Sequence, residues 1–177
     1  EPLHIYLLTA TVQSGSTLYK ALSPEVAERL SALVKSENAE NTVELFDITP
    51  LFADNPPLAN LQTRFTPCCM LRLYADLVDT LPDRLLYLDN DVICREDPSA
   101  FYRQDMTAFE LAGVLDYYGS WFFKHNLLKR DYLNSGVLLL NLKKIRETAL
   151  FERCRSRCQT VEMFMPDQSA INKLAAH

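Results

Sequence analysis

The sequence predicts an α/β protein whose sheet is mostly parallel and flanked by helices. Residues 3–10 and 43–48 are apolar, strand-like segments on either side of a helical segment beginning at Pro24, an order that favours a parallel strand–helix–strand unit. Residues 85–88 and 137–142 are nearly continuous apolar runs, which is typical of strands buried inside a sheet. Ligands of such sheets bind beyond the carboxyl ends of the strands, so we expect the site there.

Size and composition indicate an ordinary globular protein. The 177 residues fit a single domain over 1–177, and 48% of them are apolar and 23% charged. No apolar run approaches the length needed to span a bilayer, and the first residues show no signal peptide. The net charge of −5 argues against nucleic acid as a partner, because binding to phosphates needs basic patches.

The cysteines favour a reduced, cytoplasmic chain. Their number is odd and their spacing matches no metal-ligand pattern, so we expect free thiols at Cys68, Cys69, Cys94, Cys154 and Cys158.

The first half of the chain contains two predicted helices separated by a loop. Ser23 can cap a helix that has Pro24 in its first position, and its apolar face would comprise Val26, Leu30, Leu33 and Val34. Residues 50–63 include two consecutive prolines and are expected to form a loop. Thr66-Pro67 starts a second helix through residue 78. Arg72 lies in its middle, where sequence alone favours an exposed side chain.

The second half alternates strands and helices. We expect the following segments: a helical turn at 97–99, a strand at 108–115, a loop or short helix at 117–126 with His125 at the surface, one helix over 143–159, and a last helix from 166 to about 174. Gly136, directly before the apolar run at 137–142, suggests a close approach that a side chain would block.

An acidic pair ends the apolar run at 85–88. Asp89 and Asp91 would point the same way if the strand continued, so both could address one divalent metal ion. The competing interpretation is a turn, since Asp and Asn are common where strands end. An EF-hand loop is excluded, because the positions that require Gly and Glu hold Cys94 and Ala100.

Four separated blocks then occur in one order: R-L-Y-A-D-L with Arg72, L-Y-L-D-N-D-V-I with Asp89, N-S-G-V-L-L-L-N-L with Asn134, and P-D-Q-S-A-I-N with Asp167. Together they resemble the family 8 glycosyltransferases, which are retaining enzymes of the Rossmann-like GT-A fold that use sugar nucleotides and Mn²⁺. The likeness runs from about residue 3 to residue 174.

The resemblance implies a role for each matching residue. Asp89 and Asp91 match the D-x-D motif that binds Mn²⁺, or Mg²⁺ in its place, against the donor diphosphate. The donor-binding positions are matched by Arg72, Asn90, Asp116, Asn134 and Ser135. Asp167 and Gln168 match the catalytic pair near the anomeric carbon, where the glutamine carbonyl lies closest to the reacting face. The two-carboxylate scheme of glycosidases is not implied, since front-side attack is the usual proposal for the family.

The implied function is transfer of a hexose, with retention, from UDP-glucose or UDP-galactose to a glycan or lipid-linked acceptor. A bacterial lipopolysaccharide or other surface glycan is the expected product. Such an enzyme would be cytoplasmic, and would be peripheral to the inner face of the membrane through a C-terminal region that this sequence does not match.

Two family features are not matched, so the GT-A domain is expected to be incomplete at both ends. One is an earlier strand with an Asp-x-x-Tyr block that holds the nucleoside base. The other is a later His-x-x-Gly-x-x-Lys-Pro-Trp block, which supplies the third metal ligand; His177 does not replace it. We therefore expect weaker Mn²⁺ binding and low or no transferase activity from these 177 residues alone.

Two alternatives remain at the level of sequence. A truncated GT-A domain could be inactive alone or act as a binding module. A haloacid-dehalogenase-type phosphatase also places D-x-D at a strand end, but Ile93 and the motif's position some ninety residues into the chain do not fit it.

Overall fold

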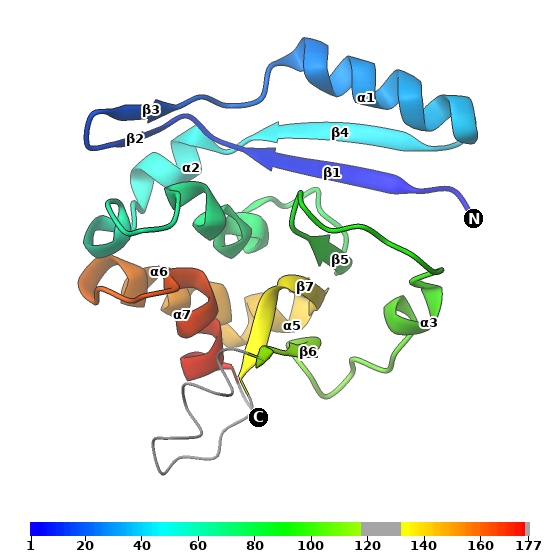
Figure 1. Cartoon of the computed structure of the whole chain (residues 1–177). Helices are drawn as coiled ribbons and strands as arrows, with labels where there is room; N and C mark the ends of the chain where they lie inside the picture. Colours follow the sequence, from blue (N-terminus) through cyan, green and yellow to red (C-terminus); the bar gives the residue numbers. More distant parts are fainter. Residues whose placement is uncertain (118–131, 176–177) are drawn as a thin grey trace.

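The computed structural model describes residues 1–117 and 132–175 (Figure 1). His125, His177 and the expected loop after Tyr117 lie outside the described residues. The elements are, in order, β1 (His4–Thr9), β2 (Val12–Ser14), β3 (Thr17–Tyr19), α1 (Pro24–Glu37), β4 (Thr42–Asp47), α2 (Thr49–Asp54), η1 (Leu58–Asn60), η2 (Pro67–Leu77), β5 (Arg84–Leu88), α3 (Ser99–Tyr102), β6 (Leu111–Leu115), β7 (Leu133–Asn141), α5 (Leu142–Thr148), α6 (Leu150–Thr160) and α7 (Pro166–Leu174).

The N-terminal layer confirms the predicted strand–helix–strand unit. β1 and β4 pair in parallel, with His4 opposite Thr42 and Thr9 opposite Asp47, and α1 covers the outer side of this pair (Figure 1). α1 begins at Pro24 as expected, but its buried position is Ala27, whereas Val26 and Leu33 are exposed. The predicted apolar face of this helix was therefore wrong in part.

A small antiparallel hairpin, β2–β3, follows β1 and was not predicted. Its turn contains Gly15 at φ 56°, a backbone conformation that side chains disfavour. A glycine between two short strand-forming segments was the available sequence signal.

The second sheet has the order β5-β7-β6, and β7 runs antiparallel to both neighbours. The α/β class is confirmed, but among the described strand pairs only β1–β4 is parallel. The expectation of a mostly parallel sheet rested on the strand–helix–strand order of the N-terminal segments and on the family resemblance, and the apolar run at 137–142 agreed with it. A strand whose two faces are both covered by other elements is apolar throughout, whatever its direction. Such a run therefore indicates burial of both faces and does not indicate parallel pairing.

Two helical segments differ from expectation. The expected loop at 50–63 contains α2 and η1. The single helix expected over 143–159 is interrupted at Ala149, which adopts a left-handed conformation at φ 52° and separates α5 from α6. Neither change has a strong local signal in the sequence. At the second one the local signal even opposes the break, because alanine usually favours a continuous helix.

The helix η2 occupies the centre of the molecule, between the β1–β4 pair and the helices α5, α6 and α7 (Figure 1). It has 3-10 geometry, and its residues from Met70 to Ala75 are all buried. The core around it includes Tyr74, Leu138, Ile145 and Phe151. Arg72 lies inside this buried run, so the surface position that its sequence context favoured was wrong.

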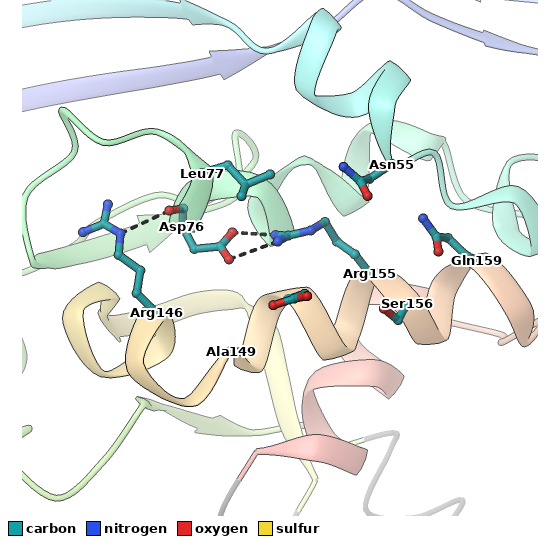
Figure 2. Close-up of a pocket in the computed structure, with 9 residues that line it drawn as sticks. Asn55, Asp76, Leu77, Arg146, Ala149, Arg155, Ser156 and Gln159 are labelled. Carbon is teal, nitrogen blue, oxygen red and sulfur yellow. Dashed lines mark hydrogen bonds and ion pairs between the residues drawn. The ribbon is translucent and has the colours of Figure 1, made fainter.

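The end of η2 is attached to α5 and α6 by two arginines (Figure 2). The Asp76 carboxylate forms a buried ion pair with Arg155 at 2.5 Å, and the Asp76 backbone carbonyl accepts a hydrogen bond from Arg146 at 3.1 Å. A cavity of about 400 Å³ lies beside these contacts. Both guanidiniums are engaged with protein groups, so these contacts hold η2 against α5 and α6.

Candidate active site

Arg72 connects two acidic side chains from distant parts of the sequence. Its guanidinium lies 2.8 Å from Asp89 at the end of β5 and 3.2 Å from Asp167 at the start of α7. It also donates to the backbone carbonyls of Cys69, at 2.9 Å, and Ser135. The Arg72 side chain is only 3% exposed, and a buried guanidinium requires such compensation.

Asp89 is oriented by its neighbours. Its Oδ1 accepts hydrogen bonds from Arg72 and from the Tyr87 hydroxyl, which lies 2.7 Å away. Its backbone N–H donates to the carbonyl of Gly136, and a Cβ added to Gly136 would lie 2.9 Å from Asp89 Oδ2. The close approach expected at Gly136 is therefore confirmed.

The strand does not continue to Asp91. β5 ends at Leu88, and the N–H of Val92 donates to the carbonyl of Asp89 at 3.2 Å, which closes a turn. Asn90 and Asp91 are exposed in this turn. The chain turns directly after β5, so the acidic pair lies at the carboxyl end of a strand.

The start of α7 meets the start of β7. The Ser135 hydroxyl donates to Asp167 at 2.9 Å, and the Ser135 N–H donates to Gln168 Oε1 at 2.9 Å. Gln168 Nε2 donates to Asp116 Oδ2 at 3.0 Å, and Asn134 Nδ2 lies 3.3 Å from the same oxygen. Both ends of the glutamine amide are thus fixed.

One network, buried except at the half-buried Asp89 and Asn134, therefore joins seven of the nine predicted site residues. These are Arg72, Asp89, Asp116, Asn134, Ser135, Asp167 and Gln168. Asn90 and Asp91 lie next to it in sequence, and no described contact joins them to the network. Four blocks separated along the chain thus converge on one place.

Three residues that sequence reasoning did not single out support this network. Tyr87 contacts Asp89 and also stacks on Arg72, whose guanidinium carbon lies 4.4 Å from its ring centre. Asn172 holds both the N–H and the C=O of Leu133, at 2.6 and 2.8 Å, and so ties α7 to β7. Asn60 binds the backbone just before α7, at the Val161 carbonyl and the Met163 N–H. Strand alternation was the available signal for Tyr87, which is two residues before Asp89.

Burial keeps two ionisable groups near the network neutral. It raises the pKa of the Tyr87 hydroxyl well above its usual range, against the opposing effect of Arg72. It also raises the pKa of the Cys69 thiol, and the neighbouring Asp167 carboxylate adds to that shift. Tyr87 is therefore a hydrogen-bond donor, and Cys69 is no nucleophile at neutral pH.

Comparison with known proteins decides the family. The profile described as "Glycosyl transferase family 8" matches residues 4–175, nearly the whole chain. The chain belongs to glycosyl transferase family 8. A lipopolysaccharide 1,2-glucosyltransferase of Escherichia coli (strain K12) is 32% identical over 114 residues, which are 58% of this chain and 33% of that protein. The chain thus spans about a third of this curated relative.

Solved structures confirm the fold expected for the family. A bifunctional glycosyltransferase, WbbM, superposes with a TM-score of 0.72 at 14% identity, over 98% of this chain and 37% of that one. An active-site mutant of LgtC superposes with a TM-score of 0.67 at 19% identity, over 98% of this chain and 71% of that one. Both likenesses establish the GT-A fold.

Asp89 and Asp91 of this family 8 member provide some, but not all, of the ligands that a hard divalent cation needs. Arg72 and Tyr87 both use Asp89 Oδ1, so Oδ2 and the exposed Asp91 carboxylate are the oxygens that a cation could share. Within residues 1–117 and 132–175, no group of three His, Cys, Asp or Glu side chains could hold a metal. The other ligands would come from phosphate oxygens or water.

No helix in the described part of this family 8 chain combines the length and the apolar character that crossing a bilayer requires. The thiols of Cys154 and Cys158 are buried and free.

Proposed function

We propose that the chain forms the donor-sugar and metal end of a retaining hexosyltransferase site, within a single catalytic domain. The observation that supports this most is the network centred on Arg72, because it unites the four blocks shared with the family. The substrates we propose are a UDP-hexose, either UDP-glucose or UDP-galactose, and a glycan or lipid-linked acceptor. The galactosyltransferase LgtC, one of the structural relatives, is known in complex with donor and acceptor sugar analogues.

Asp89 and Asp91 are the residues that would hold Mn²⁺, or Mg²⁺ in its place. A bound divalent cation neutralises charge that develops on the departing diphosphate. Arg72 holds Asp89 in one orientation through a charged hydrogen bond, and Tyr87 supports the same oxygen. These two contacts preorganise the carboxylate before any ligand arrives.

Asp116, Asn134 and Gln168 would orient the donor sugar. Asp116 accepts hydrogen bonds from both amides, and these contacts would fix its carboxylate in one orientation beside the sugar. Gln168 Oε1 accepts from the Ser135 N–H and lies 3.3 Å from the Ser135 hydroxyl, and these contacts would fix the amide carbonyl beside the anomeric carbon. In the proposed front-side reaction the acceptor hydroxyl forms a bond to that carbon, the bond to the diphosphate breaks, and the hydroxyl proton passes to the leaving phosphate.

Calorimetry with Mn²⁺ and each UDP-hexose tests this proposal. We expect binding that depends on Mn²⁺ and that weakens at least about tenfold in Asp91→Asn, because the exposed Asp91 carboxylate can be removed without disturbing the core. Asp79→Asn, which changes another exposed aspartate, is the matched control. An absence of nucleotide-sugar binding with Mn²⁺, or equal binding by Asp91→Asn, would refute the proposal.

Product analysis distinguishes a transferase from a binding module, the two functions that the family resemblance allows. Transfer to a glycan acceptor with retained anomeric configuration, measured by NMR of the product, supports the transferase. Donor binding without transfer supports a binding module instead. Release of inorganic phosphate that depends on Asp89 and Mg²⁺ would revive the phosphatase alternative.

The proposed setting is the biosynthesis of lipopolysaccharide or another surface glycan, at the cytoplasmic face of the membrane. The named activity of the E. coli relative supports this setting.

A further inference from the structure

A second cavity, of about 460 Å³, lies between two loops on the surface. It is lined by Gln62, Thr63, Arg64, Glu162, Met163 and Phe164. Phe65 and Phe164 meet edge to face at its border, with ring centres 5.6 Å apart, although they are 99 positions apart in sequence. Both rings are accessible to solvent, and Phe164 is 64% exposed. We call this cavity with its aromatic pair the Phe65–Phe164 groove.

The backbone beneath the groove is fixed. The Asn60 side chain is fully buried and donates to the carbonyls of Cys158 and Val161, each at 2.7 Å. Its Oδ1 accepts from the N–H of Met163 at 2.8 Å. Three hydrogen bonds from one amide thus hold the two loops together, so the aromatic pair is presented on a preorganised support.

The groove lies near the candidate active site along the chain. Phe164 precedes Gln168 by only four residues, a separation that limits the distance between their Cα atoms to about 14 Å. Met165 lies between them, and its sulfur contacts Gln168 Nε2 at 3.4 Å. An oligosaccharide in the groove could therefore extend its terminal residue to the catalytic pair.

The chemistry of the groove suits a polyhydroxylated, uncharged ligand. Arg64 and Glu162 carry opposite charges, so the lining has little net charge, and with Gln62 and Thr63 they offer both hydrogen-bond donors and acceptors. The aromatic rings add an apolar surface against which the C–H faces of a sugar can pack. A membrane surface would instead require a broader apolar patch with an excess of basic residues.

We propose that the Phe65–Phe164 groove binds the acceptor glycan and directs its terminal hydroxyl toward Asp167 and Gln168. This inference rests on the proposed transferase function. It assigns the acceptor site to a surface distinct from the donor network.

Binding can be tested without turnover. The probe is the oligosaccharide released by mild acid from E. coli K12 lipopolysaccharide and then freed of its phosphate groups by hydrogen fluoride. Binding is followed by NMR of the protein with ¹³C-labelled phenylalanine. We expect the resonances of Phe65 and Phe164 to shift, and the affinity to fall about tenfold in Phe164→Ala. Phe109→Ala, at another exposed phenylalanine outside the groove, should bind as the wild type does. Unshifted Phe65 and Phe164 resonances, or equal binding by Phe164→Ala, would overturn the inference.

Kinetics distinguish failure of this inference from failure of the proposed function. Phe164→Ala should raise the acceptor KM about tenfold while the Kd of the UDP-hexose changes less than about twofold. Sugar transfer with an unchanged acceptor KM would overturn the assignment of the groove as the acceptor site, but it would leave the proposed transferase function intact. Absence of UDP-hexose binding in the wild type would overturn the transferase, and with it the acceptor assignment. Loss of binding to phosphatidylglycerol vesicles in Phe164→Ala, without competition by the oligosaccharide, would assign the groove to the membrane instead.

Discussion

Replacement of Arg72 by methionine should destabilise the protein strongly. Methionine keeps much of the buried volume but leaves the carboxylates of Asp89 and Asp167 without their cation. The Asp167 side chain is 6% exposed, whereas that of Asp89 is 33% exposed and can recover some hydration. Removing one member of a buried ion pair costs about 3–5 kcal/mol, and we expect Arg72→Met to fall in this range, chiefly through Asp167.

Urea unfolding followed by far-ultraviolet circular dichroism measures this loss. The double variant Arg72→Met/Asp167→Asn removes both charges, so it should be more stable than Arg72→Met alone. Arg103→Met is the matched control, because Arg103 pairs with Glu1 on the surface and should contribute little. A loss of less than about 1 kcal/mol in Arg72→Met, or a double variant no more stable than the single one, would refute the reasoning.

Three further predictions follow from single contacts. Gly136→Ala places a Cβ against Asp89 Oδ2 and should weaken Mn²⁺ binding about tenfold by calorimetry; unchanged affinity would contradict this. Asn60→Ala leaves buried backbone groups unpaired and should lower the free energy of unfolding by about 2–3 kcal/mol in urea, whereas a change near zero would mean that water replaces the amide. Burial raises the pKa of Cys154 and Cys158 to about 12, so between pH 9 and about 12 the unfolded state releases protons that the native state retains. The free energy of unfolding should then fall as pH rises, and replacing both cysteines by alanine should reduce this slope, by at most about 2.7 kcal/mol per pH unit.

Most elements could be predicted because their signals are local. Ser23-Pro24 and Pro166 mark helix starts, and the apolar run at 85–88 marks a strand that ends within one residue of its expected position. The direction of β7 and the interruption at Ala149 depend on tertiary packing. Residue patterns within a short window do not contain that information.

The candidate site shows the same division. Its residues could be selected by resemblance, and the contact at Gly136 follows from the missing side chain. The contacts among them could not be predicted, because Arg72 meets Asp167 across 95 positions of sequence. Arg72 shows this most clearly, since a helical arginine has an exposed side chain unless buried carboxylates happen to surround it. Whether these residues bind a donor sugar stays a prediction.

The interruption at Ala149 decides which side chains can meet at Asp76. Arg146 and Arg155 are nine residues apart, and nine residues of an unbroken α-helix rotate through about 900°, which would point the two side chains in opposite directions. The left-handed residue resets this rotation, so both arginines reach Asp76, one at its carbonyl and one at its carboxylate. Asp76 follows Arg72 by four residues on η2. A single alanine between two helices thereby helps to fix the helix from which Arg72 reaches the acidic residues of the site.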